Sequence, residues 1–440
     1  MSVFLCAETC IAEIQSEKAG KSMKIELPVF LVQEEDMFKR ALQSYRDILI
    51  LCIAASVIGV IVGMLDAGFG EVLLWITGQR ERHPFLFIPF LPLAGALMIG
   101  AYQKAGKNCL KGMGLVFQVR FREEREIPLR LIPFTIISTW ATHLFGGSAG
   151  REGVAVQIGA TVAHGIGSRL RVANASGILL VAGMAAGFAG LFQTPIAAVF
   201  FALEVLVAGV LDYEALLPAL TASVIAAKVS HFMGLEKFSV PLDLSIHLTL
   251  AFCVKLLVVG LAFGITGGIF ARSLKKLKEV TGGLLQNPIH KIAVMGAAVG
   301  LFSLLIHAGR YSGLGTNLIQ SCFGGGTVYP YDWIVKLVFT IVTLAAGFQG
   351  GEVTPLFSIG ASLGLVLGNF LNLPAAFIAA LGYAGVFSGA TNTFIAPVFI
   401  GAEVFGFQYL PYFFAVCAIA HVVSGSQSIY PAQRKHHLEL

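Results

Sequence analysis

Charged side chains are scarce in this sequence. Of its 440 residues, 12% are charged and 56% are hydrophobic, whereas an ordinary soluble domain carries about 25% charged residues. Residues 337–433 hold two charged side chains, Glu352 and Glu403, and 50 uncharged positions separate them. One spanning helix needs only about 20 apolar residues. This scarcity excludes a soluble enzyme, a disordered chain and a single-span anchored domain, and it predicts an all-α polytopic membrane protein.

The patterns of several common chemical sites are missing as well. The seven cysteines form no CxxC pair and have no ligand histidines nearby, so neither a disulfide framework nor a zinc site is expected. The three glycines at 324–326 lack the Lys-Ser/Thr of a phosphate-binding loop. Because no HExxH cluster or nucleophile–base set is present, an intramembrane enzyme is disfavoured. A purely structural scaffold is disfavoured too, because it would have no use for broken helices with buried acids. No cofactor, metal or nucleic-acid partner is expected.

The charges that are present gather near the N-terminus and in one later segment. Residues 1–47 contain 14 charged side chains of both signs, and we expect residues 1–44 to form a charged cytoplasmic segment before a single membrane domain at 45–434. Apolar runs near 48–78 and 85–103 flank an expected polar turn at 80–82. The basic residues between 104 and 130 indicate a cytoplasmic loop, and the N-terminus two spans earlier is then cytoplasmic too. The tail 435–440 resembles appended residues and is assigned no function.

Many of the later apolar runs are short and interrupted by Gly or Pro. They lie near 131–146, 153–168, 174–191, 195–211, 215–233, 246–271, 289–308, 333–348, 355–371, 374–389, 395–406 and 410–424. Segments this short cannot each cross the bilayer, so some are expected to meet partway as broken helices that point at a buried site. This arrangement is typical of transporters and channels.

The two halves of the sequence resemble each other. The segment IAAVF at 196–200 aligns with IAPVF at 395–399 at an offset of 199, and the same register matches Glu204 to Glu403. Coincidence in Gly/Ala-rich sequence is the alternative, but several agreements in one order favour duplicated halves at about 45–235 and 245–430. We interpret Glu204 and Glu403 mainly as structural acids.

Other polar residues inside the apolar runs leave their roles open. Those at 193–194 and 391–393 precede the repeated segments, where they either cap a broken helix or face an ion pathway. His143, His307 and His421 lack ligand spacing, so we expect them to be histidines of the core whose hydrogen bonds are satisfied.

The sharpest local signal is the glycine-rich segment GGSAGREGVAVQ at 146–157. A glycine-rich break leads into an apolar helix, with Glu152 at its beginning. Unpaired N–H groups at a helix N-terminus form an anion site. A carboxylate placed there acts as a tethered anion, and once protonated it can leave. The alternative is that Glu152 only complements the helix dipole, with Arg151 as its ion-pair partner.

This segment resembles the GREGP motif of the CLC anion channels and anion/proton antiporters. In the family's order, GMGLV at 112–116 takes the place of GSGIP, GEVTP at 351–355 takes the place of GxFxP, and Tyr430 falls where an anion-coordinating tyrosine is expected. The resemblance covers about residues 45–434. It implies a CLC-like fold of two inverted repeats with many tilted, broken helices. It also implies a homodimer with one pathway per subunit, in a bacterial inner membrane, with both termini cytoplasmic. No CBS pair is expected, because the chain stops about ten residues after Tyr430.

Departures from the family motifs resemble the fluoride-exporting branch, the CLC-F fluoride/proton antiporters. The serine of GSGIP is Met113, the proline of GREGP is Val154, and the phenylalanine of GxFxP is Val353. Met113 offers a thioether and no strong donor, although plain packing is the alternative for this residue. Fluoride is small and strongly hydrated, so a site needs close donors such as backbone N–H groups, hydroxyls or the edge of an aromatic ring. The anion-binding residues expected from the resemblance are Met113, Gly153, Val154, Val353, Thr354 and Tyr430.

The proton route is a further departure. Chloride/proton exchangers of the family carry a second glutamate where this sequence has Val205. Either Glu152 reaches the inner side by another path, or Glu352 substitutes for the missing acid; a structural cap is the alternative for Glu352. The leading hypothesis is export of fluoride in exchange for protons, with Glu152 as the shared gate. A chloride/proton antiporter or a passive anion channel of the same family is the alternative.

Overall fold

A computed structural model describes residues 29–244, 246 and 249–435, with side chains from residue 43 onward. Most of the predicted cytoplasmic segment 1–44, and the tail beyond Lys435, lie outside the described residues. The chain divides into two compact units, Met1–Leu49 and Ile50–Leu440. Helix α2, Val29–Arg82, crosses this boundary, and all later elements belong to the second unit.

The second unit consists of helices of very uneven length. In the first half α2 is followed by α3 (Pro84–Phe87), α4 (Leu91–Ala101), α5 (Met113–Arg120), α6 (Leu131–Leu144), α7 (Glu152–Gly167), α8 (Ala175–Phe192), α9 (Pro195–Glu204) and α10 (Leu216–Phe232). The second half contains α11 (Leu250–Leu284), α12 (Pro288–Leu305), α13 (Thr316–Phe323), α14 (Asp332–Ala346), α15 (Val353–Phe370), α16 (Ala375–Thr391), α17 (Ile395–Phe405) and α18 (Leu410–Ser424). Within the described residues, eight helical segments are long and apolar enough to cross a membrane. The chain is therefore a multi-pass membrane protein.

Short helical turns and one strand pair complete the description. One-turn helices lie at Ile88–Phe90, Lys107–Lys111, Tyr213–Ala215, His307–Gly309 and Phe407–Tyr409, and a π-helical turn lies at Tyr102–Gly106. Strand β1 (Val207–Ala208) pairs in parallel with β2 (Arg434–Lys435). This pairing fixes the chain shortly after Tyr430 and so helps to position that residue.

The first loop differs from the expectation drawn from sequence. Helix α2 continues through 80–82, so the predicted polar turn is wrong and the chain turns at His83 instead. Arg80 is only 1% exposed. Its guanidinium donates to the His143 carbonyl at 3.0 Å and to Glu81 at 3.1 Å. The His143 carbonyl thus binds the Arg80 guanidinium in the protein interior, whereas the sequence pattern predicts that Arg80 lies in a solvent-exposed turn.

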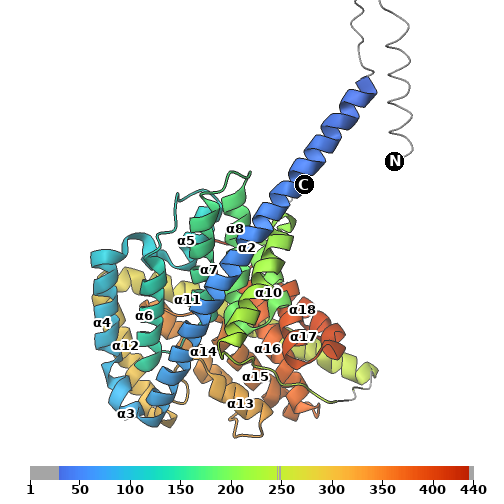
Figure 1. Ribbon diagram of the computed structural model, residues 1–440. Coiled ribbons are helices and arrows are strands. Elements are labelled where there is room, and N and C mark those ends of the chain that lie inside the picture. The colour runs from blue at the N-terminus through green and yellow to red at the C-terminus, as the bar shows by residue number, and fades with distance from the viewer. Residues whose placement is uncertain (1–28, 245, 247–248, 436–440) are drawn as a thin grey trace, which may run out of the picture. The chain divides into compact units, whose positions relative to one another are not determined.

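Glycine contacts explain how short apolar helices pack in pairs. Helix α7 packs against α8, and α15 packs against α16 in the same way (Figure 1). A Cβ atom at Gly159 would overlap the Gly183 carbonyl across the first pair, and a Cβ at Gly360 would overlap the Gly382 carbonyl across the second. Small residues let helix backbones approach closely in lipid. The same device therefore operates at equivalent places in both halves.

Reciprocal caps show that the two halves are inverted. Glu204, the last residue of α9, accepts hydrogen bonds from the N–H groups of residues 394–396 at the start of α17. Glu403, near the end of α17, accepts them from residues 196 and 197 at the start of α9, at 3.3 and 2.8 Å. Helices α9 and α17 therefore run antiparallel, each with its end at the other's beginning. This geometry supports the interpretation of both glutamates as structural acids.

The core contains one large apolar cluster and one small one. The large cluster includes residues from both halves. The second, which we call the small apolar cluster, consists of Phe69, Leu73, Val154, Ala155, Ile158, Leu191, Leu235 and Leu314. It lies where α2, α7 and α8 come together, next to the beginning of α7.

Candidate functional site

Two helices begin back to back at the junction of the halves. Gly150 and Gly351 form an antiparallel bridge, in which each N–H donates to the other residue's carbonyl, at 2.5 and 2.8 Å. Helix α7 begins two residues after Gly150, and α15 begins two residues after Gly351. Because the bridge is antiparallel, the helices lead away from it in opposite directions. Two N-terminal ends, each with unpaired N–H groups, therefore meet at one place.

The Glu152 carboxylate occupies the N-terminus of α15. Its Oε2 atom accepts a hydrogen bond from the Thr354 N–H at 3.2 Å, and its Oε1 atom accepts one from the Thr354 hydroxyl. The Arg151 N–H also donates to Oε2, at 3.2 Å, and the Arg151 guanidinium lies 3.8 Å from Oε1. Glu152 is 0% exposed. The carboxylate thus acts as an anion at a helix N-terminus, but the helix belongs to the other half of the chain rather than being its own.

Glu352 lies in a contrasting environment. It is the residue immediately before α15, and its carboxylate accepts no side-chain hydrogen bond within the described part of the chain. Its Oε2 atom lies 3.9 Å from the position that a Cβ atom would take on Gly153, at the start of α7. Glu352 is half-buried and lines a cavity. Each of the two acids therefore lies at the helix N-terminus of the other half: the Glu152 carboxylate is bound at the start of α15, and the Glu352 carboxylate lies beside the start of α7.

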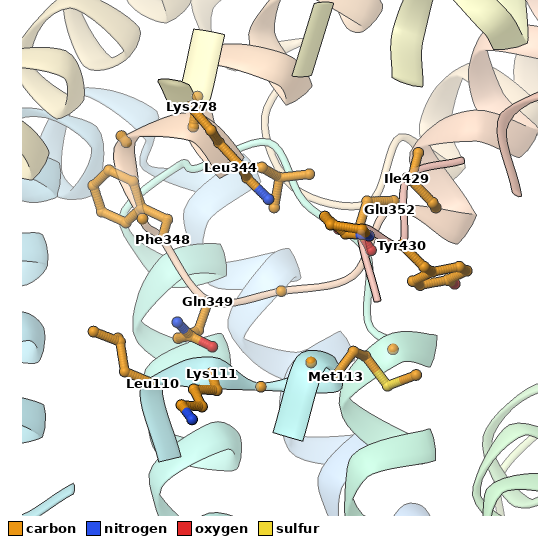
Figure 2. A pocket seen from close by; sticks show the side chains of 18 of the residues that line it. Leu110, Lys111, Met113, Lys278, Leu344, Phe348, Gln349, Glu352, Ile429 and Tyr430 are labelled. Atoms are coloured by element: carbon orange, nitrogen blue, oxygen red, sulfur yellow. The ribbon is translucent and has the colours of Figure 1, made fainter. Parts of the chain in front are cut away.

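A cavity of about 530 Å³ leads to this junction. Figure 2 shows Glu352 and Tyr430 on one side of it, with Lys278 reaching in from the side opposite Lys111 and Met113. Lys291 also lines the cavity. Its lining residues include three lysines, of which Lys111 is paired with Glu124 at 2.7 Å, and one acid, so the cavity carries an excess of positive charge.

Met113 and Gln157 form another part of the cavity wall. Met113 is the first residue of α5, and Gly112 before it has a φ of +52°, which glycine adopts without strain. The Gln157 amide nitrogen donates to the Gly153 carbonyl at 3.1 Å, and its Oε1 atom has no hydrogen-bond partner among the described residues. Met113 itself offers no strong donor. This wall is apolar apart from one amide.

Tyr430 presents an aromatic surface to the cavity. The residue is 5% exposed. Its ring stacks on Phe117 at 5.8 Å between centroids and meets Phe201 edge-on at 6.3 Å. Ring edges carry partial positive charge. The Tyr430 and Phe117 rings therefore form an aromatic part of the cavity wall, with Phe201 behind Tyr430.

The six residues expected to bind the anion lie in different surroundings. Met113, Gly153 and Tyr430 line the cavity, and Thr354 contacts the Glu152 carboxylate instead. The Val154 side chain belongs to the small apolar cluster, and its N–H donates to the Arg151 carbonyl at 3.1 Å. Val353 is 1% exposed at the first position of α15. Anion binding by these six residues stays a prediction.

The histidine expectation is confirmed for one residue and wrong for two. His143 is buried, with Nδ1 2.8 Å from the Thr139 carbonyl and Nε2 3.0 Å from the Ala149 carbonyl. His307 is exposed because the chain turns there after α12, and it stacks on Tyr329 at 5.0 Å. His421 lies near the end of α18, and its Nδ1 atom has no partner within the described ranges.

The polar residues before the repeated helices α9 and α17 lie where the preceding helices α8 and α16 end. Gln193 and Asn392 both end a helix in the left-handed conformation, each with a φ of +56°. The Gln193 amide donates to the Leu235 carbonyl, and the Asn392 amide donates to Gln433 at 3.3 Å. Neither residue lines the cavity. The expected capping of α9 and α17 by these polar residues is wrong as well, because no side chain at 193–194 or 391–393 caps either helix and Glu403 and Glu204 bind their N–H groups instead.

Sequence reasoning did not assign several residues of the cavity wall to the site, among them Gln157, Lys278 and Lys291. Gln157 stands in the glycine-rich segment but was not assigned a place in the site. Lys278 follows the predicted run near 246–271, because α11 continues to Leu284 and carries it to the cavity, whereas Lys291 lies at the start of the predicted run near 289–308, on α12. The amphipathic end of α11 is the signal that could have found Lys278, since four basic residues at 272–278 follow the uncharged stretch 256–271.

The fold and the site together define an inverted-repeat membrane protein in which a buried glutamate carboxylate is bound at the N-terminus of a helix from the other half. A family model described as "Voltage gated chloride channel" matches residues 94–425. The chain belongs to this family, also known as the CLC family. A protein named "Chloride/fluoride channel protein" from Pseudomonas syringae pv. tomato is 36% identical over 397 residues, which cover 88% of this chain and 87% of that protein.

Solved structures share the architecture. A CLC-type fluoride/proton antiporter is 52% identical and superposes with a TM-score of 0.87, covering 88% of this chain and 98% of the other. A slow cyanobacterial Cl⁻/H⁺ antiporter superposes with a TM-score of 0.75 at 19% identity, covering 86% of this chain and 96% of the other. The second likeness concerns the fold alone. The inverted-repeat CLC-like fold expected from sequence is confirmed.

Proposed function

We propose that this protein is a secondary active transporter that exports fluoride in exchange for protons, with Glu152 as the shared gate. The observation that carries the proposal is the Glu152 carboxylate bound by the N–H and hydroxyl of Thr354 at the start of α15. A group that already sits where an anion binds competes with the transported anion. Protonation removes its charge and therefore its attraction for the helix end.

The identity of the anion rests on several supports. The 52% identical structure is that of a CLC-type fluoride/proton antiporter, and the name of the Pseudomonas relative includes fluoride. At the site, Met113 replaces a hydroxyl donor by a thioether, while Thr354 and Tyr430 keep hydroxyls. Fluoride, a small and strongly hydrated ion, gains most from close donors of this kind.

Glu352 is the proposed second proton-carrying group. It lines the cavity without a side-chain hydrogen bond in the described structure, so its carboxyl group is available to water. Since Val205 stands where other exchangers of the family carry an acid, a cavity-facing glutamate at the junction offers an alternative inner route. The protein works as a homodimer with one pathway per subunit, in a bacterial inner membrane, with both termini in the cytoplasm.

A flux assay on the full chain in liposomes tests the proposal. Fluoride and chloride efflux are followed with ion-selective electrodes while external pH is recorded. Wild-type protein is expected to move fluoride with protons, and Glu152→Gln is expected to abolish the coupled movement. Glu279→Gln, an exposed acid on α11, is the matched control. Coupled exchange that persists in Glu152→Gln refutes the gate, and chloride efflux equal to fluoride efflux refutes the selectivity in favour of a chloride/proton antiporter or a passive channel.

A further inference from the structure

Lys336 is a buried basic residue that the proposed exchange does not use. It lies in the first half of α14 and is 0% exposed, although lysine is rarely buried completely. Within the described structure, its hydrogen-bond partners are a hydroxyl and two backbone carbonyls rather than a carboxylate. Burial of an ammonium group without a counter-ion is costly. The burial of Lys336 therefore points to the segments that its three N–H donors hold together.

The Lys336 ammonium joins α14 to two other parts of the chain. It donates to the Ser148 hydroxyl at 2.9 Å, to the Tyr311 carbonyl at 3.0 Å and to the Gly313 carbonyl at 2.7 Å. The Gly313 N–H in turn donates to the Gly147 carbonyl at 2.9 Å. The loop before α13 is thus bound both to α14 and to the glycine-rich break before α7. All three donors of the ammonium are used, so none is left for an ion.

Ser148, in the glycine-rich break, is held by α14 at three points. Its hydroxyl meets Lys336 and, at 2.9 Å, the Thr340 hydroxyl, and its N–H donates to the Thr343 hydroxyl at 3.1 Å. Lys336, Thr340 and Thr343 are spaced by four and three residues, so they lie on one face of α14. Ser148 precedes Glu152 by four residues. This face of α14 therefore fixes the chain just before the gate.

Helix α14 also contacts the other partner of the gate. It packs against α15 and leads into it through the loop that contains Gly351. Thr354, in the first turn of α15, binds the Glu152 carboxylate. Because Glu152 and Thr354 come from different halves of the chain, their contact depends on how the halves are held together. Helix α14 does this by binding Ser148 on one side and α15 on the other.

We propose that Lys336 is a positioning residue of the gate, which holds the glycine-rich break so that the Glu152 carboxylate reaches Thr354. This inference rests on the proposed function. Lys336 does not line the cavity, so it acts through Ser148 and not on the transported ion. Without the ammonium, Glu152 competes less well for the α15 N-terminus, and fluoride binds more tightly. Proton-coupled turnover falls at the same time, because a misplaced carboxyl group transfers its proton less often.

The test compares Lys336→Met with Lys255→Met. Lys255 lies on α11 and donates to the carbonyl of Leu371, at the far end of α15, at 2.7 Å. Full-length protein is reconstituted in liposomes for proton-coupled fluoride exchange, and fluoride affinity is measured by titration calorimetry in detergent. We expect Lys336→Met to slow coupled exchange by at least about tenfold. We expect it to raise the apparent fluoride affinity by about threefold to tenfold, since part of the hydrogen bonding to the competing carboxylate is lost. Lys255→Met should behave as wild type.

The Glu152→Gln background separates positioning from direct binding. There the charged competitor is absent, so the addition of Lys336→Met is expected to leave the fluoride affinity within about twofold of that of Glu152→Gln alone. Coupled exchange by Lys336→Met at the wild-type rate overturns the inference. A fluoride affinity that does not rise also overturns it, and an affinity that falls together with the exchange rate assigns Lys336 a purely structural role. A rise of equal size in both backgrounds contradicts the action through Glu152.

A second pair of variants keeps the ammonium and removes one of its acceptors. Ser148→Ala takes away the hydroxyl that receives the Lys336 ammonium, whereas Ser223→Ala removes a buried hydroxyl on α10. We expect smaller changes in the same two directions in Ser148→Ala only, and these decide the inference if Lys336→Met does not fold. Wild-type exchange and fluoride affinity in Ser148→Ala count against it.

The same measurements distinguish failure of this inference from failure of the proposed function. If wild-type protein moves fluoride without protons, or if Glu152→Gln keeps coupled exchange, the proposed function fails first. If wild-type exchange is coupled and is lost in Glu152→Gln, while the variants at Lys336 and Ser148 match wild type, the role of Lys336 alone fails.

Discussion

The contact between Glu152 and Thr354 gives the sharpest quantitative prediction. If the carboxylate competes with fluoride for the α15 N-terminus, it lowers the apparent association constant of fluoride. The apparent constant falls further the larger the equilibrium constant is for binding of the Glu152 carboxylate at that terminus. Thr354→Val removes the hydroxyl that donates to Glu152 Oε1. A hydrogen bond to a charged group contributes about 1.5–3 kcal/mol. The substitution therefore weakens the competitor by that amount, and it weakens fluoride binding too if the same hydroxyl serves the ion.

A double-mutant cycle separates these two effects. In the Glu152→Gln background the charged competitor is gone, so Thr354→Val shows its full loss of fluoride affinity. In the wild-type background the loss is largely cancelled. The predicted coupling between the two substitutions is about 1.5–3 kcal/mol.

Fluoride affinities of the four proteins, measured by titration calorimetry in detergent, supply the cycle. Thr354→Ser keeps the hydroxyl and serves as the control, with affinity expected near that of wild type. Additive effects of Thr354→Val and Glu152→Gln, with a coupling below about 0.5 kcal/mol, refute the competition between carboxylate and fluoride.

Three further predictions concern packing, capping and the cavity. Glu403→Gln weakens the cap on α9 and lowers thermal stability in detergent, by roughly 1 kcal/mol, whereas the same change at exposed Glu279 has no effect; equal melting temperatures contradict the reciprocal caps. Gly183→Ala overlaps the Gly159 carbonyl and should reduce thermal stability and the yield of monodisperse protein; a stable Gly183→Ala variant contradicts the close packing of α7 on α8. Lys278→Gln should slow fluoride flux several-fold at low ionic strength and much less at about 1 M salt, because exposed charges are screened; a salt-independent effect argues against electrostatic attraction in the cavity.

Sequence patterns predicted the parts of this site that are local. The glycine-rich break before Glu152, the apolar run after it and the repeat that pairs Glu204 with Glu403 are all properties of short segments. Their structures follow from helix termini that need partners. Met113, Gly153 and Glu352, which come from three different motifs of the sequence, line one cavity in the folded chain.

The partners across the two halves could not be predicted in the same way. Glu152 binds the N-terminus of α15, about two hundred residues later, because an antiparallel bridge between Gly150 and Gly351 brings the two helix ends together. Arg80 is buried because the His143 carbonyl receives its guanidinium. Each of these contacts depends on tertiary packing, which local periodicity does not contain.

Uphill transport tests the central claim most directly. Liposomes that contain the full chain are loaded with fluoride and diluted into fluoride-free buffer of equal pH, and the internal pH is followed with a trapped dye while the membrane potential is clamped. A fluoride/proton antiporter must use the outward fluoride gradient to draw protons inward, so the interior acidifies below the external pH. Glu152→Gln should leave the internal pH unchanged. Fluoride that leaves wild-type liposomes with no acidification contradicts the account.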